Sequence, residues 1–447
     1  MNALPSVSRF PALSRLSLAV ALVVGASGAQ AQSLVELYDA ARGYDTTLQA
    51  ARAQYDANFA KAEQARAGLR PQAGLAAGAN AANSRNDVTD SSRVNHTQNI
   101  TLSASQPLYR PANKIADEQG QLSIEIARAQ LEAAEQDLMV RTAQAYFDVL
   151  AAQDTLTVVQ AQKTAVSEQL ASAKRNFEVG TSTVTDSREA QARYDLVIAQ
   201  EIAASNDLRV KKLALDQLVG RTGASPKPLA APVVLPNVQP TEVDTWVSEA
   251  QKQHPLVRQA QTALDIAELE ARKAQAGHKP TLDLVGQYQI ARGPNSNFPT
   301  VPNVRTNVAS IGVQFNLPLY AGSAITNRVK EAVALSEKAR ADRETALRSI
   351  AQAVRSAYYG VVSGAGQVKA LEAAETSSQS ALDANKLGYQ VGVRINIDVL
   401  NAQSQLYQTK RDLAVARYNV LVGQLRLKQA GGVLKADDLQ PINALLK

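Results

Sequence analysis

The chain contains one structural unit twice, and this duplication constrains its fold more than any other feature. Short motifs recur in the same order, shifted each time by about 210 residues. The matched pairs are Ala65–Pro71 with Ala274–Pro280, Pro107–Tyr109 with Pro318–Tyr320, Ala145–Phe147 with Ala357–Tyr359, and Phe177–Gly180 with Tyr389–Gly392. We therefore predict two repeats of similar structure, 32–220 and 242–432, followed by a C-terminal segment, 433–447.

Between the repeats, residues 221–241 contain five prolines, which are Pro226, Pro228, Pro232, Pro236 and Pro240. Proline at this density cannot continue a helix, so the segment is predicted to be an extended linker along the outside of the molecule.

The first 31 residues have the pattern of an export signal. Arg9 and Arg15 form a positive region, Leu16–Val24 an apolar core, and Ala29–Ala31 a small-x-small cleavage site. A membrane anchor is the alternative, but the apolar core is shorter than the ~20 residues of a spanning helix. We expect a signal peptide over 1–31 and a mature chain that starts at Gln32. The absence of cysteine excludes disulfides, thiolate metal sites and an N-terminal lipid anchor.

Each repeat contains two stretches in which apolar and polar residues alternate with period two. Ile311, Val313 and Phe315, for example, share one face, while Ser310 and Gln314 share the other. The four predicted strands are about 72–82, 96–108, 281–290 and 306–317. Polar and Pro-rich hairpin tips are expected at 83–93 and 293–303. Strands of this length with one apolar face are typical of outer-membrane barrels, although a half-buried sheet of a soluble protein shows the same pattern.

Four strands are too few to close a barrel, and an open sheet edge cannot face lipid. If the strands cross a membrane, several chains must share one barrel. Three chains give about twelve strands, whereas two give about eight, and side chains fill the interior of an eight-stranded barrel. A channel therefore favours a trimer.

Two proline-free segments predict helices of unusual length, about 112–178 and 323–390. At ~1.5 Å per residue each would be roughly 100 Å long, which indicates a coiled-coil-like assembly. Both end in Val-Gly, where glycine can adopt the left-handed conformation that terminates a helix. Shorter helices are expected at about 47–67, 186–219, 256–276 and 398–429. Asp186 with Glu189 fits a capping box for the first of the two returning helices.

The order of these elements and the tip motifs resemble the TolC family of outer-membrane channels. The most specific matches are Phe177–Gly180, Val184–Asp186, Ala190–Asp195, Gly388–Arg394 and Asp398–Leu400. The resemblance implies a mixed α and β membrane protein. Its trimeric TolC-like fold would have a shared twelve-stranded barrel in the outer membrane and a long helical barrel in the periplasm.

The resemblance also implies a gate at the periplasmic mouth. Tyr389 and Arg394 are similar to the gate tyrosine and arginine of the family, with Thr185 and Asp186 as partners on the other tip. Asp398 is similar to the first aspartate of the family's acidic constriction ring, but Asn401 occupies the second ring position. From spacing alone, Asp186 and Asp398 could equally be residues that favour a helix N-terminus.

The expected function is that of an exit duct for secreted proteins or small toxic compounds, without catalysis and without a cofactor or metal. His96, His254 and His278 stand outside any catalytic motif. Charges of both signs and 4% aromatic residues argue against a nucleic-acid partner. The resemblance implies a periplasmic membrane-fusion adaptor and an inner-membrane ABC or proton-driven pump as partners, besides outer-membrane lipid. The alternatives are a periplasmic coiled-coil adaptor without membrane strands and a secreted hydrolase.

Overall fold

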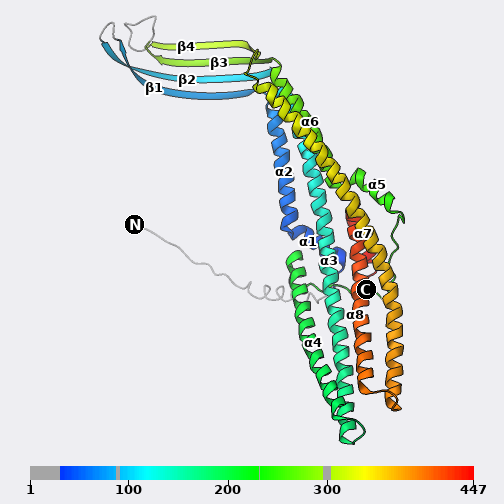
Figure 1. Cartoon of the computed structure of the whole chain (residues 1–447). Coiled ribbons are helices and arrows are strands. Elements are labelled where there is room, and N and C mark those ends of the chain that lie inside the picture. Colours follow the sequence, from blue (N-terminus) through cyan, green and yellow to red (C-terminus); the bar gives the residue numbers. More distant parts are fainter. Residues whose placement is uncertain (1–30, 87–90, 231, 295–303) are drawn as a thin grey trace, which may run out of the picture.

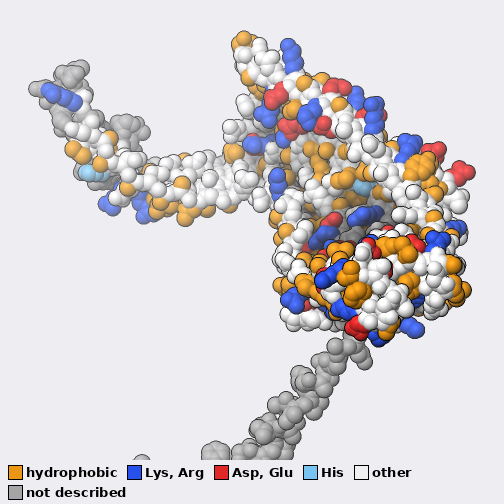
Figure 2. Space-filling model, turned by 60° about the horizontal axis from the view of Figure 1, so that its bottom comes forward, with side chains coloured by type: hydrophobic (Ala, Val, Ile, Leu, Met, Phe, Trp, Pro, Cys, Tyr) orange, Lys and Arg blue, Asp and Glu red, His pale blue; other side chains and the backbone are white. Residues whose placement is uncertain are grey.

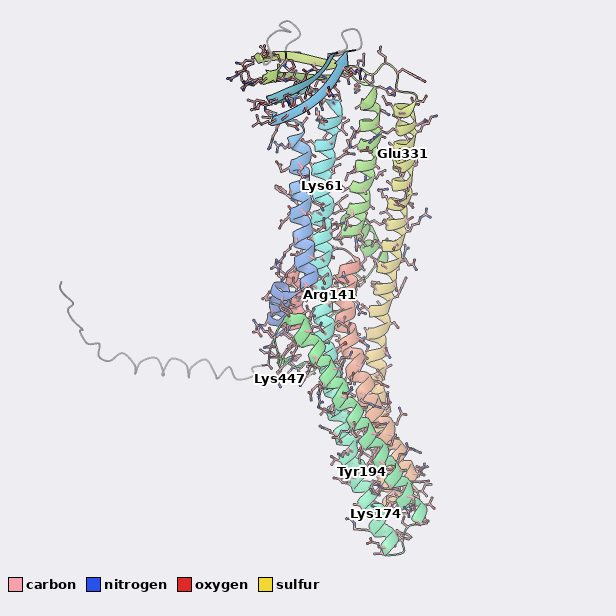
Figure 3. All side chains as sticks on the ribbon, turned by 90° about the vertical axis from the view of Figure 1, so that its left-hand side faces the viewer. Lys61, Arg141, Lys174, Tyr194, Glu331 and Lys447 are labelled. Atoms are coloured by element: carbon pink, nitrogen blue, oxygen red, sulfur yellow. The ribbon has the colours of Figure 1, made fainter. Side chains whose placement is uncertain are left out.

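The protein is an elongated molecule with a sheet at one end and helical hairpins at the other (Figure 1). The structure is a computed structural model that describes residues 31–86, 91–230, 232–294 and 304–447. The expected signal peptide, apart from residue 31, residues 87–90 of the first expected hairpin tip and residues 295–303 of the second therefore lie outside the described residues. Figure 3 places Glu331 near the sheet and Lys174 near the opposite end.

The sheet has four antiparallel strands in the order β1-β2-β3-β4. The strands are β1 Gln72–Asn86, β2 Ser91–Tyr109, β3 Thr281–Gly293 and β4 Val304–Asn316. Strands were expected in these four regions, but all four run further toward the hairpin tips than predicted. The added residues are mostly polar, so backbone pairing continues where the apolar alternation has already stopped.

The register aligns the apolar positions of all four strands on one face. Leu75 pairs with Leu102, Leu102 with Tyr288, and Leu284 with Val313. Within this single chain the aligned side chains are exposed, with Ile311 81% and Leu75 73% accessible. The opposite face carries mainly Ser, Thr, Asn and Gln. A sheet with an apolar, unpacked band on one face matches the requirement for contact with lipid tails.

Two very long helices carry the chain away from the sheet. They are α3 Pro111–Glu178 and α7 Ala324–Gln390, and both agree with the predicted segments within a residue. The other long helices are α2 Thr46–Ala67, α4 Val184–Val219, α6 Pro255–Gln275 and α8 Asn396–Ala430. The described residues also form five shorter helices that were not predicted, α1 Leu34–Tyr44, α5 Val243–Gln253, η1 Ala276–His278, η2 Ala436–Asp438 and α9 Leu439–Asn443. Because α2–β1–β2–α3–α4 is repeated as α6–β3–β4–α7–α8, the duplication in the sequence is a duplication in the fold.

A charged pair fixes the sheet to the helical part where the two meet. Arg110, at the N-cap position of α3, donates two hydrogen bonds to the Asp283 carboxylate on β3, at 2.7 and 2.6 Å. The bidentate geometry is that of a strong, directional ion pair. It connects the end of the first repeat's hairpin with the start of the second repeat's hairpin.

The main hydrophobic core lies where the helices from both repeats meet. Tyr146 and Phe147 of α3 are fully buried, and the Phe147 ring stacks on Tyr418 of α8 with centroids 5.5 Å apart. The Tyr146 hydroxyl donates to the Lys227 carbonyl at 2.9 Å, which anchors the linker to this core. The Ala-Tyr-Phe motif thus packs at the centre of the helical part.

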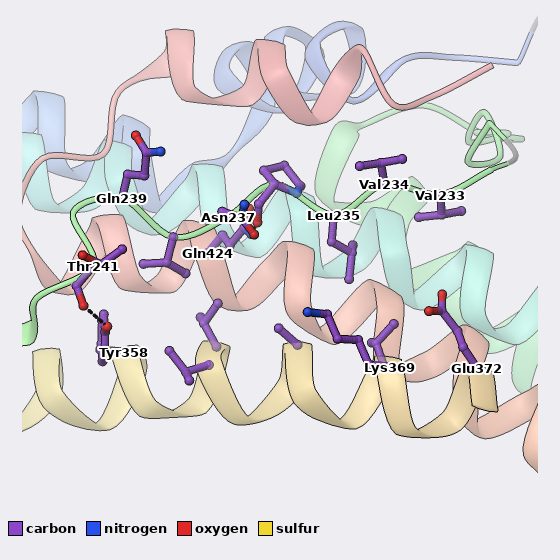
Figure 4. Close-up of a pocket in the computed structure, with 16 residues that line it drawn as sticks. Val233, Val234, Leu235, Asn237, Gln239, Thr241, Tyr358, Lys369, Glu372 and Gln424 are labelled. Carbon is purple, nitrogen blue, oxygen red and sulfur yellow. Dashed lines mark hydrogen bonds between the residues drawn. The ribbon is translucent and has the colours of Figure 1, made fainter. Parts of the chain in front are cut away.

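The linker between the repeats is extended, and part of it crosses α7 and α8 (Figure 4). Residues 233–239 and Thr241 border a hollow of about 580 Å³ together with Tyr358 and Gln424. The Tyr358 hydroxyl donates to the Thr241 carbonyl, and Gln424 donates to the Pro236 carbonyl at 2.6 Å. The linker is therefore attached to the helices by side-chain hydrogen bonds.

Candidate gate at the helical tips

Two turns end the molecule on the side opposite the sheet, one joining α3 to α4 and one joining α7 to α8 (Figure 1). Gly180 and Gly392 follow the two long helices with φ of 81° and 78°. The amides of Thr181 and Val393 donate back to the carbonyls of Asn176 and Gly388, at 2.8 and 2.9 Å. Both turns are therefore Schellman motifs, and the predicted left-handed glycines are confirmed.

The predicted capping box at Asp186 is wrong in its register. Helix α4 starts two residues earlier than expected, with Thr183 as its N-cap and Asp186 as its third residue. The Thr183 hydroxyl accepts from the Asp186 amide at 3.2 Å, and the Asp186 carboxylate accepts from the Thr183 amide at 3.0 Å. Thr183 takes the N-cap position because its hydroxyl satisfies a free amide there.

These bonds keep Asp186 ionised. Burial by itself raises the pKa of this carboxyl, but hydrogen bonds from Thr183 and Ser182 outweigh that effect and bring the pKa below its ordinary value of 3.8. A lowered pKa in the folded state stabilises the turn at every pH above the ordinary value. The contribution is lost only as the pH falls below it, so the cap is intact at neutral pH.

Asn396, the first residue of α8, connects the two tips within one chain. Its side chain is 1% exposed, accepts from Gln169 of α3, and donates to the Asp186 carbonyl of α4 at 3.3 Å. A second connection joins the long helices, because Asn176 of α3 donates to the Tyr389 hydroxyl of α7 at 3.2 Å. Three helices therefore meet around one buried amide directly beside the expected gate residues.

Arg394, which lies just before α8, forms an ion pair at 3.7 Å with Asp398 in the first turn of that helix. Within this chain Arg394 therefore pairs with Asp398, and Asp186 is engaged by Thr183 and Ser182. Asp398 does not cap α8, whose N-cap Ile395 makes no side-chain bond to the helix. The carboxylate lies in the first helical turn, where the helix dipole favours a negative charge.

The remaining expected residues lie in the same region. Thr185 is exposed in the first turn of α4, and Tyr389 is half-buried near the end of α7. The amide oxygen of Asn401 accepts from Arg193 of α4 at 2.9 Å. The structure thus brings all the expected gate and ring residues to the tip region, but links them through Asn176, Gln169, Asn396 and Arg193, which were not predicted.

No residues in the described part of the chain form a group of three or more His, Asp or Glu that could hold a metal ion. Among the described residues, no helix combines the length and the apolar character needed to cross a bilayer.

A duplicated helix–hairpin–helix unit, a sheet with one unpacked apolar face, and hydrogen-bonded tips at the far end define one subunit of a shared membrane channel with a helical tunnel. The comparisons with known proteins agree. The family model described as "Outer membrane efflux protein" matches residues 24–221 and 246–433, one segment for each repeat. The chain belongs to this family.

Individual relatives extend the match to nearly the full length. The "Outer membrane protein TolC" of Vibrio cholerae is 34% identical over 432 residues, covering 97% of this chain and 98% of the relative. The "Alkaline protease secretion protein AprF" of Pseudomonas aeruginosa is 30% identical over 430 residues, covering 93% of this chain and 87% of the relative. Among solved structures, the outer membrane protein VceC from Vibrio cholerae superposes with a TM-score of 0.74, at 20% identity and over 89% and 96% of the two chains.

The predicted fold class is confirmed by these matches. The protein is a trimeric outer-membrane channel subunit that contributes four strands to a twelve-stranded barrel, with the helical part in the periplasm. The reading as a periplasmic adaptor without membrane strands is not supported.

Proposed function

We propose that the trimer is the outer-membrane exit duct of a tripartite export machine, joined through a periplasmic adaptor to an inner-membrane pump. The observation that carries this function is the pairing, in one chain, of a sheet whose outer face has a long apolar band with helices of 68 and 67 residues. The sheet crosses the outer membrane, and the helices, roughly 100 Å long, extend the duct through the periplasm. Its relatives are named for efflux and for protease secretion, so both kinds of cargo suit a duct of this design.

Members of the family are channels, and we infer that this chain likewise catalyses nothing and leaves the energy for transport to its pump. The export signal predicted over 1–31 is consistent with this route, because an outer-membrane subunit must first cross the inner membrane.

We further propose that the tips form the closed periplasmic gate, with Thr185, Asp186, Tyr389 and Arg394 as its links and Asp398 as its constriction ring. A threefold axis would place three Asp398 carboxylates around one throat. Each has an Arg394 guanidinium 3.7 Å away, which partly compensates its charge. Asn401 carries no charge, and its amide oxygen accepts a hydrogen bond from Arg193. The throat is thus weakly acidic and favours cations.

Replacing Asp398 tests this arrangement. We expect Asp398→Ala to weaken the block of single-channel current by a trivalent cation, added on the periplasmic side, by about tenfold, since a ring of three carboxylates is lost. The measurement is the half-blocking concentration in planar bilayers at pH 7. Asp437→Ala, which removes an exposed carboxylate near the C-terminus, is the matched control and should leave the block unchanged. Equal half-blocking concentrations in the unaltered trimer, Asp398→Ala and Asp437→Ala would mean that Asp398 does not form the constriction ring.

A further inference from the structure

Two arginines lie side by side on the apolar face of the sheet, at its far end. Arg292 of β3 and Arg305 of β4 are direct partners in the register, and Gln98 of β2 is the next residue across. Side chains alternate along a strand, so Arg292 shares its face with Ile290 and Tyr288. Both arginines therefore belong to the lipid-facing surface and not to the polar face of the sheet.

Their position along the strand corresponds to the edge of a membrane. From Leu282 to Arg292, β3 runs about 33 Å at ~3.3 Å per residue. At the ~40° tilt of barrel strands this is about 25 Å along the membrane normal, close to the ~25 Å height of the apolar band of an outer-membrane barrel. The helices leave the sheet from its other end (Figure 1). Arg292 and Arg305 thus stand at the level of the outer leaflet's headgroups.

The two guanidinium groups are exposed. Among the described residues, neither forms an ion pair with a carboxylate. Like charges directly opposite one another in a sheet repel, so this arrangement has a cost that a bound anion would remove. Arg85 of β1 lies on the same face and has an interaction of its own.

Next to the arginines the same face is hollowed. The hollow, of about 530 Å³, has Arg292 and Arg305 at one side, and Ala77 and Ala79 leave space beside Ile100 and Ile290. Figure 2 shows hydrophobic side chains along the sheet and Lys or Arg side chains towards its far end. A cationic pair beside an apolar hollow fits a ligand that has an anionic head and hydrocarbon chains.

We propose that this surface binds a phosphate-bearing glycolipid of the outer leaflet. The guanidinium groups of Arg292 and Arg305 hold the phosphate, for which the planar arginine fork is suited, and an acyl chain occupies the hollow over β1 and β2. A free phosphate ion would use the arginines alone and leave the apolar hollow empty. The lipid uses both, and it therefore fits the surface better.

The test is native mass spectrometry of the purified trimer with lipid A that carries two phosphates. We expect Arg292→Gln with Arg305→Gln to weaken binding by about tenfold or more, since each arginine at a headgroup surface contributes to attraction of anionic lipid. Lipid A stripped of both phosphates should bind the unaltered trimer about as weakly as the double variant binds the phosphorylated lipid. Excess inorganic phosphate should not displace the bound lipid.

Arg209→Gln with Arg348→Gln removes two exposed charges from the helical part and should leave binding unchanged. Should the glutamine pair fail to assemble, Arg292→Lys with Arg305→Lys keeps both charges and should give an intermediate loss, because lysine cannot hold phosphate in a bidentate manner. Unchanged affinity in the glutamine variant, equal binding of the phosphate-free lipid, or displacement by inorganic phosphate would each overturn the proposal.

Discussion

At the scale of single residues, the contacts between the helical tips are made largely by amide side chains, and less by the charged residues that the sequence motifs indicate. Asp186, Tyr389 and Arg394 could be selected beforehand because their motifs resemble the family. Asn396 could not, since its counterpart in the first repeat is the exposed Val184 and its partner Gln169 lies on a distant part of the chain. A contact between two helices that are far apart in sequence has no local pattern.

Removing the Asn396 amide should loosen the tips. In Asn396→Leu, which has a similar volume, Gln169 and the Asp186 carbonyl lose their partner, at a cost of about 1–3 kcal/mol for each buried group. We expect faster amide hydrogen exchange in both turns, measured by mass spectrometry on peptides spanning 176–190 and 388–401. Asn385→Leu is the control, because the Asn385 side chain bonds only within its own helix, to the Ala381 carbonyl. Unchanged exchange in Asn396→Leu would show that the amide does not hold the tips.

At the scale of elements, the sequence predicted the long helices to within a residue because the absence of proline and the Val-Gly ends are local signals. It predicted the strands too short, since it followed the apolar face and not the backbone pairing, which continues to Asn86 and Ser91. The short helices α1 and α5 were missed, because each is only 11 residues long and is stabilised largely by packing on the longer helices.

The contact between α3 and α8 contains a partly buried carboxylate, that of Asp154. The Tyr418 hydroxyl donates to Asp154 at 2.6 Å. Burial raises the pKa of Asp154 above 3.8, although the bond from Tyr418 opposes this. A raised pKa means that the folded chain holds this proton more tightly than the unfolded chain. Protonated Asp154 therefore favours folding at low pH, and this contribution is lost as the pH rises through the pKa of the folded state.

Asp154→Asn should keep the acceptor for Tyr418 and remove the buried charge. We expect its melting temperature at pH 7.5 to equal or exceed that of the unaltered protein, and the difference between the two proteins to shrink as the pH is lowered toward 4. Asp154→Leu, in contrast, leaves the Tyr418 hydroxyl without a partner and should destabilise the chain by about 1–3 kcal/mol. The measurement is thermal unfolding of the detergent-solubilised trimer across this pH range. A marked loss of stability in Asp154→Asn at pH 7.5 would mean that the charge itself is required.

At the scale of the whole molecule, a single chain leaves surfaces exposed that only neighbouring subunits can cover. The apolar face is exposed, four strands leave two open edges, and much of each long helix is unburied within one subunit. Three copies remove the open edges by closing the sheet into a barrel. The number of subunits could be inferred from the sequence, because four strands per chain give an open barrel interior only when at least three chains combine. The contacts at the periplasmic mouth could not be inferred, because they depend on where the folded tips lie.

The central claim, that this trimer is a gated duct, is tested most directly by current through single molecules in a planar bilayer. The purified trimer should give discrete unitary currents of small amplitude, because the tips are linked and the mouth is nearly closed. Tyr389→Phe with Arg394→Ser should raise the unitary conductance several-fold. Tyr359→Phe with Arg348→Ser, which alters exposed residues elsewhere on α7, should leave it unchanged. The absence of unitary currents, with the protein recovered as a soluble periplasmic monomer, would contradict the account.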